Sequence, residues 1–148
     1  MAAPPLPHRH SGAQVSPFHE AVQLRADTVN VVVARRFVRN ALAACNADEV
    51  VVADLELISS ELVTNAILHA TGDIVDISVS CDGNVVTLSV TSIGNDHQVG
   101  PSRHWRIAEP DSITGRGLGI VRSLADRIEV RHRAGALQIV VERTLSAA

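Results

Sequence analysis

The 148-residue sequence contains no lysine and no tyrosine, so all 13 of its basic residues are arginine. Three kinds of chemistry depend on a lysine: the P-loop nucleotide site, the strand lysine of eukaryotic-type kinases, and Schiff-base catalysis. The sequence therefore excludes all three. A protein of this composition that handles ATP must hold the phosphates with other groups.

The sequence also has few aromatic residues, few cysteines and a small net charge. Aromatics make up 2% and the formal net charge is −3, so no stacking surface or large basic face is evident, and nucleic acid is not an expected partner. Cys45 and Cys81 lack CxxC spacing, which is typical of thiols in a reducing compartment. No stretch approaches the ~18–20 apolar residues of a membrane span, and no signal peptide is evident. We therefore expect a cytoplasmic protein with no membrane partner.

Hydrophobic residues make up 46% of the sequence, which is enough to bury a core in one domain. Residues 1–17 combine proline, histidine, serine and glycine and predict a flexible arm, followed by a single domain over 18–148. His8 and His10 are close enough to share a metal ion. No cysteine or carboxylate accompanies them, so a metal site there is disfavoured.

The first part of the domain predicts a strand and then a helix. Alternating apolar and polar letters indicate a strand over 20–26, and Asp27 or Thr28 begins a helix that reaches about residue 45. Its expected apolar stripe comprises Val32, Phe37, Val38, Ala41 and Leu42. The remaining face carries Arg35, Arg36 and Arg39. We expect this arginine face to be solvated, the alternative being a docking surface for a partner.

A second, longer helix and two hairpins follow. The helix begins after Asn46 or Asp48 and ends near residue 70, where Thr71 and Gly72 stop it. Its expected buried stripe comprises Val51, Leu55, Ile58 and Leu62. Turn signals at 82–84 and 134–135 predict two β-hairpins, and a short helix over 117–126 lies between them. This order predicts an α/β two-layer sandwich, a mixed and mostly antiparallel sheet of about five strands with about three helices on one face.

The first candidate site is ELVTNAILHA, which begins at Glu61 on the last turns of the long helix. Glu61 and Asn65 are four residues apart and therefore lie on one face of the helix. The amide oxygen of asparagine is a hard ligand suited to Mg²⁺, and a nearby carboxylate can accept a proton from a hydroxyl. The alternative is a solvent-facing polar stripe on an amphipathic helix.

The second candidate site is the glycine-rich turn over 114–120. Closely spaced glycines that lead into a helix expose backbone N–H groups at its positive end, where phosphate oxygens can bind. Such a turn can equally be a plain connector. A dinucleotide fingerprint needs a preceding strand and a third glycine at position 120, which is Ile120, so Rossmann-type binding is disfavoured.

Taken together, these two motifs make the chain resemble the Bergerat-fold ATP-binding proteins from about Glu20 to Leu145. ELVTNAILHA is similar to their N box, and GRGLGIVRSLADRIEV, which starts at Gly115, is similar to their second glycine box. The smallest members of that superfamily are the bacterial anti-sigma-factor serine kinases and the single-domain regulatory ATP-binding proteins of actinobacteria. The resemblance implies a histidine-kinase-like ATP-binding domain that uses ATP and Mg²⁺.

The resemblance also implies a role for each residue of the two motifs. Asn65 would hold Mg²⁺ against the ATP phosphates, and Glu61 would be the general base or orient it. The stretch over 93–114, which has no periodicity, would be the ATP lid. The residues implied to lie along the triphosphate are Gly115, Arg116, Gly117, Leu118 and Gly119.

One position departs from the family pattern. The first glycine box of the family has an aspartate that binds the adenine amino group, with a glycine two residues later; this chain has Ser92 and Gly94. A hydroxyl is a weaker acceptor than a carboxylate, and losing one charged hydrogen bond costs roughly 1.5 to 3 kcal/mol, on the order of ten- to a hundredfold in affinity.

Two functions follow from the resemblance. The favoured one is an ATP-binding serine/threonine protein kinase that sequesters a sigma factor, phosphorylates a small anti-sigma-factor antagonist protein, and forms a homodimer. The alternative is a regulatory module of the same fold that binds partners but has weak or lost nucleotide binding, for which Ser92 is the evidence.

Overall fold

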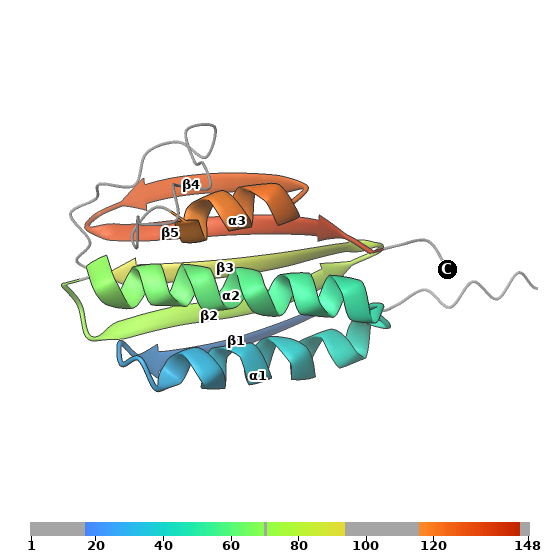
Figure 1. Cartoon of the computed structure of the whole chain (residues 1–148), viewed down its shortest axis with the longest axis horizontal. Helices are drawn as coiled ribbons and strands as arrows, with labels where there is room; N and C mark the ends of the chain where they lie inside the picture. The colour runs from blue at the N-terminus through green and yellow to red at the C-terminus, as the bar shows by residue number, and fades with distance from the viewer. Residues whose placement is uncertain (1–16, 70, 94–115, 146–148) are drawn as a thin grey trace, which may run out of the picture.

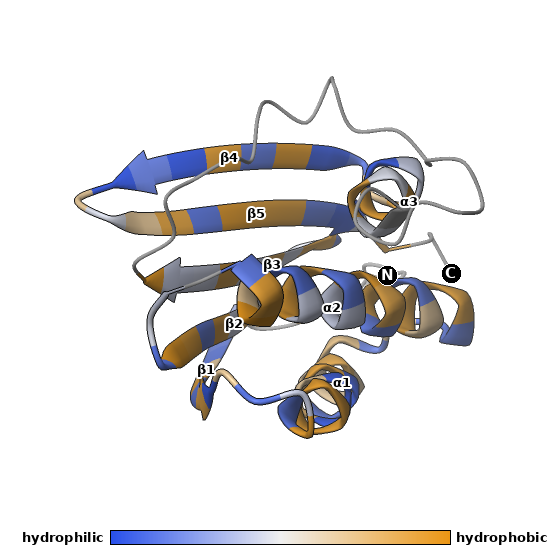
Figure 2. Ribbon diagram, turned by 60° about the vertical axis from the view of Figure 1, so that its left-hand side comes forward, coloured by the Kyte–Doolittle hydropathy of each residue, from blue (hydrophilic) through white to orange (hydrophobic). Residues whose placement is uncertain are grey.

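The computed structural model describes residues 17–69, 71–93 and 116–145. They form two layers, a β-sheet and a layer of helices packed on one of its faces (Figures 1 and 2). In chain order the elements are β1 (Phe18–Arg25), α1 (Asn30–Leu42), the 3₁₀ turn η1 (Ala43–Cys45), α2 (Glu49–His69), β2 (Ile74–Asp82), β3 (Val85–Ile93), α3 (Arg116–Leu124), β4 (Arg127–Arg133) and β5 (Ala136–Thr144).

The sheet has the order β1-β2-β3-β5-β4, and each neighbouring pair of these described strands is antiparallel. The predicted sandwich of five strands and three helices is confirmed, and the sheet is antiparallel throughout where a mixed one was expected. The expected arm lies almost wholly outside the described residues, as do His8 and His10. All of the expected lid except Ile93 also lies outside them.

Both predicted hairpins occur at the predicted turns. Gly83 has a φ of 61°, and Ala134 and Gly135 have φ values of 43° and 80°. Two-residue turns that match the twist of antiparallel strands need positive φ, which glycine adopts without steric cost. The turn chemistry therefore sets the register of β2 with β3 and of β4 with β5.

The core lies between the sheet and α2. Alternate residues of β2, β3 and β5 are buried, as expected for strands with one covered face. The predicted stripe of α2 is confirmed, since Val51, Leu55, Ile58 and Leu62 are all buried against the sheet. The carboxylate of Asp48 accepts a hydrogen bond from the backbone N–H of Val51 at 2.9 Å and caps the start of this helix.

The predicted stripe of α1 is partly wrong. Val32 is 57% exposed, whereas Ala34, Val38, Ala41 and Leu42 are buried. These four have the spacing i, i+4, i+7 and i+8 of one helix face, and Val32 lies about 200° from Ala34. The helix begins at Asn30, after a turn in which the Asp27 carboxylate accepts the Val29 N–H at 3.1 Å.

The expected solvated arginine face is exposed, and one of its members is paired. Arg39 donates to Glu49 at 2.9 Å and to Glu56 at 2.8 Å, and so links α1 to α2. The hydrogen bond from Arg39 holds the pKa of Glu56 below its usual range. Exposed pairs of this kind contribute little to stability, so α1 is held mainly by its apolar stripe.

Two further expectations concern thiols and membranes. Cys45 and Cys81 are both buried and neither forms a disulfide. Burial, and after it a hydrogen bond with Cys81, raises the pKa of the Cys45 thiol to about 12, so it is neutral at physiological pH. None of the described helices is long and apolar enough to cross a membrane.

Candidate functional site

The two motifs, some fifty residues apart in the sequence, meet at one end of the sandwich. The last turns of α2 lie beside the first turn of α3 (Figure 1). Together they line a hollow of about 40 Å³. Its lining residues are Glu61, Thr64, Asn65, Leu68, His69, Gly117 and Leu118. The structure thus brings Glu61 and Asn65 together with two residues of the glycine-rich turn.

Glu61 lies directly against the first turn of α3. A Cβ atom placed on Gly117 would come well inside 3.0 Å of Oε2 of Glu61, closer than real Cβ contacts. The missing side chain of Gly117 therefore leaves the space that the Glu61 carboxylate occupies. Sequence reasoning assigned Gly117 to phosphate binding and missed this contact, which depends on how closely the two helices approach.

Asn65 lies one turn further along α2 and is half-buried in the same hollow. The start of α3 faces this region, and the first N–H groups of a helix have no partner within the helix. Leu118 packs against the core and Gly119 is buried, so both hold the first turn of α3 in place. Gly94, Gly115 and the side chain of Arg116 lie outside the described residues.

Ser92 does not line this hollow. It is 2% exposed on the helix-facing side of β3, where it pairs in register with Val75 and Leu137. The next residue, Ile93, accepts a hydrogen bond from the N–H of Gly72 at 2.9 Å. A Cβ on Gly72 would collide with this same carbonyl oxygen. Gly72 was expected only to end the helix. Its hydrogen bond and close approach to Ile93 also hold the end of β3 against the segment that follows α2.

The donor set fits Mg²⁺ bound together with a triphosphate. Within the described residues no group of three or more histidine, cysteine, aspartate or glutamate side chains could hold a metal ion alone. Mg²⁺ commonly takes only one or two protein ligands and completes its shell with water and substrate phosphates. Asn65 could supply one oxygen ligand and the open start of α3 could offer N–H donors, while Gly117 leaves room for the neighbouring Glu61 carboxylate.

A comparison with protein families decides the classification. A family profile described as "Histidine kinase-like ATPase domain" matches residues 24–142. The chain belongs to the histidine kinase-like ATPase family. This family implies ATP as the ligand. No curated protein sequence matches the chain significantly.

Among solved structures, this ATPase-family chain is similar to the RsbU and RsbW domains of Rv1364c from Mycobacterium tuberculosis. The TM-score is 0.64 at 23% sequence identity, and the match covers 87% of this chain. It spans 32% of the length of the other chain. At this identity the likeness shows a shared fold.

Proposed function

We propose that the protein is an ATP-binding serine/threonine protein kinase of the anti-sigma-factor type. The observation that carries the proposal is the meeting of Glu61 and Asn65 with the first turn of α3 in one hollow. The fold shared with part of the chain that contains the RsbU and RsbW domains of Rv1364c supports a regulatory role. The proposed partners are a sigma factor and a small antagonist protein, the proposed state is a homodimer, and the proposed compartment is the cytoplasm.

In this proposal each residue has a separate task. Asn65 holds Mg²⁺, which neutralises charge on the phosphates, and the first-turn N–H groups of α3 accommodate their oxygens. Glu61 accepts the proton of the incoming serine or threonine hydroxyl as that oxygen bonds to the γ-phosphorus and ADP leaves. The absence of a side chain on Gly117 leaves room for this carboxylate beside the first turn of α3.

Nucleotide binding is tested by calorimetric titration with Mg-ATP. The wild-type protein is expected to bind saturably, and Asn65→Ala is expected to lose most of the affinity because the side-chain oxygen ligand is gone. Asn40→Ala is the matched control, since Asn40 is an exposed asparagine on α1, far from the hollow. Equal affinity in both variants would refute the role of Asn65.

Phosphoryl transfer is tested with γ-labelled ATP and a candidate antagonist protein. Glu61→Gln is expected to bind Mg-ATP but to transfer little label to serine or threonine, because the amide cannot accept the proton. Glu142→Gln is the control, because it removes a carboxylate from the opposite face of β5. Wild-type transfer rates in Glu61→Gln would exclude Glu61 as the base.

Ser92 favours a second candidate, a partner-binding module of the same fold with weak or lost nucleotide binding. The hydroxyl of Ser92 stands where the family pattern has a carboxylate, and it is almost completely buried. A flat titration of the wild-type protein up to millimolar Mg-ATP would favour this module over the kinase.

A further inference from the structure

The face of the sheet opposite the helices carries a second hollow. All three described helices pack on one face of the sheet, and the described chain leaves the other face uncovered (Figure 2). On that face lies a hollow of about 320 Å³. It lies on the opposite side of the sheet from the site between α2 and α3.

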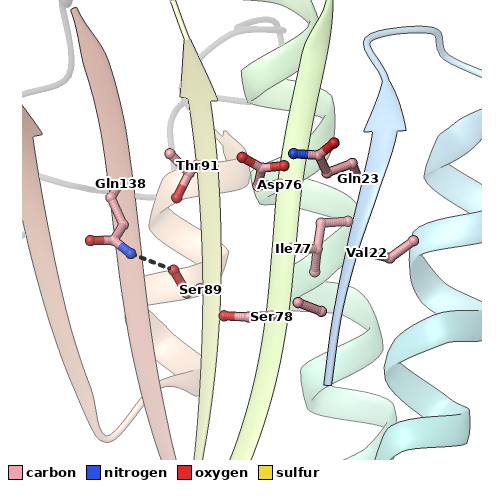
Figure 3. Close-up of a pocket in the computed structure, with 9 residues that line it drawn as sticks. Val22, Gln23, Asp76, Ile77, Ser78, Ser89, Thr91 and Gln138 are labelled. Atoms are coloured by element: carbon pink, nitrogen blue, oxygen red, sulfur yellow. Dashed lines mark hydrogen bonds between the residues drawn. The ribbon is translucent and has the colours of Figure 1, made fainter. Parts of the chain in front are cut away.

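The cross-strand register explains why the hollow forms. Ala21, Ser78 and Ser89 stand side by side on β1, β2 and β3 and form a row of small side chains. The next row contains the longer side chains of Gln23, Asp76, Thr91 and Gln138. The small row is the floor and the longer row is a wall, whose members Gln23, Asp76, Thr91 and Gln138 are labelled in Figure 3.

The wall contains one carboxylate, that of Asp76, which forms no ion pair in the described part of the chain. Oδ1 of Asp76 is shielded from solvent and has no hydrogen-bond partner. A buried acceptor without a partner costs free energy, which a donor from outside could recover. Arg131, three strands away in the same row, donates from Nε and one terminal nitrogen to Glu129 at 2.9 Å, and Arg25 lies exposed on the same face of β1, one pair beyond Gln23.

The other polar groups of the wall are mainly acceptors. The side-chain amide of Gln138 donates to the Ser89 hydroxyl at 2.9 Å, which fixes its N–H and leaves its carbonyl oxygen available. Thr91 adds a hydroxyl between Gln138 and Asp76. Gln23 is exposed on the edge strand β1, so its side chain can rotate and admit a donor to Asp76.

We infer that this hollow binds an arginine side chain presented by a partner protein. A bare metal ion does not fit, because the hollow has only one carboxylate and far more volume than an ion fills. Free arginine fits poorly, because no unpaired cation lines the hollow to receive its α-carboxylate. A guanidinium on a protein brings several donors in one plane and no added negative charge, which matches acceptors spread over neighbouring strands.

The test uses N-acetyl-L-argininamide as the probe, followed by amide chemical shifts of the whole ¹⁵N-labelled protein. Saturable shifts are expected at Ser78 and Ser89, with none at Asn65. The citrulline analogue, which has the same shape without the charge, is expected to bind at least tenfold more weakly. Equal binding of the two probes, or shifts only at Asn65, would overturn the inference.

Three variants separate charge from shape. Asp76→Asn is expected to weaken binding of the arginine probe by about ten- to a hundredfold, the effect of one charge-assisted hydrogen bond. Asp82→Asn, on the same strand and face but at the hairpin, is the matched control and should bind like wild type. Ala21→Leu fills the floor from the exposed edge strand and should abolish binding without a change of charge.

Sedimentation velocity tests the alternative occupant, a second copy of this chain. A wild-type oligomeric state that saturating arginine probe leaves unchanged supports the inference. A wild-type dimer that dissociates when the arginine probe is added, or when Asp76 is replaced by Asn, would assign the hollow to an arginine of the second copy. That result would overturn the inference of a separate partner protein.

Discussion

Gly117→Ala isolates the contact between α3 and the Glu61 carboxylate. The φ of Gly117 is not positive, so the backbone accepts alanine, and the added Cβ meets only the far end of a flexible side chain. Moving Glu61 off its rotamer costs about 0.5–1.5 kcal/mol. Alanine in place of glycine in a helix contributes up to about 1 kcal/mol in the opposite direction. The free energy of unfolding is therefore expected to change by less than about 1 kcal/mol, while the Glu61 carboxylate is displaced and phosphoryl transfer is lost.

A double-mutant cycle in urea denaturation measures the contact itself. Glu61→Asp withdraws the carboxylate by one methylene, so Gly117→Ala should become stabilising in that background, with a coupling free energy of about 0.5–1.5 kcal/mol. Ser123→Ala, on the exposed side of α3, serves as the control and should show no coupling to Glu61. A coupling of zero for Gly117 would refute the reasoning that Glu61 occupies this space.

Three further predictions concern other parts of the structure. Gly72→Ala should lower the free energy of unfolding, measured in urea, by about 1–3 kcal/mol. The added Cβ meets the main-chain oxygen of Ile93, which cannot move aside as a flexible side chain can. An unchanged free energy of unfolding would exclude this close approach. The N–H of Thr144 donates to the Asp126 carboxylate at 2.6 Å and holds the pKa of that carboxyl below its usual range. The ionised carboxylate therefore stabilises the fold above pH ~4, and this stabilisation is lost as the pH falls through the lowered pKa of Asp126. Urea midpoints should therefore fall less between pH 6 and pH 3 in Asp126→Asn than in wild type, and equal falls would contradict this. Ser92→Asp should tighten Mg-ATP binding by about ten- to a hundredfold in calorimetry and lower the melting temperature of the free protein, because the new carboxylate is buried; unchanged affinity would show that position 92 does not contact the nucleotide.

The sequence predicts well those parts of the fold that local chemistry determines. The hairpin turns need residues that tolerate positive φ, and Gly83 and Gly135 occupy such positions. The α2 stripe is long and regular, so its period is clear. The α1 stripe is less clear, because several valines surround the small buried residue Ala34 in the sequence. The hydrophobicity and size of these side chains do not show that the alanine, and not a valine, faces the core.

The site could be predicted only in part. The spacing of Glu61 and Asn65 places both on one helix face, but the face that α3 covers depends on long-range packing. The contact of Glu61 with Gly117 and that of Gly72 with Ile93 have no local pattern, because each joins segments that are distant in the sequence. The same is true of the ion pair between Arg143 and Asp54 at 2.9 Å. The roles of Ser92 and of the phosphate-binding residues stay predictions.

The strand order has a consequence for solubility. β1 and β4 are the two edges of the described sheet, where unpaired backbone groups can recruit a strand from another molecule. β4 alternates Arg127, Glu129, Arg131 and Arg133 along one side, and β1 places Glu20 on its inward-facing side beside Phe18 and Val22. A strand added at either edge would have to desolvate these charges. Both edge strands therefore disfavour edge-to-edge aggregation of the folded protein.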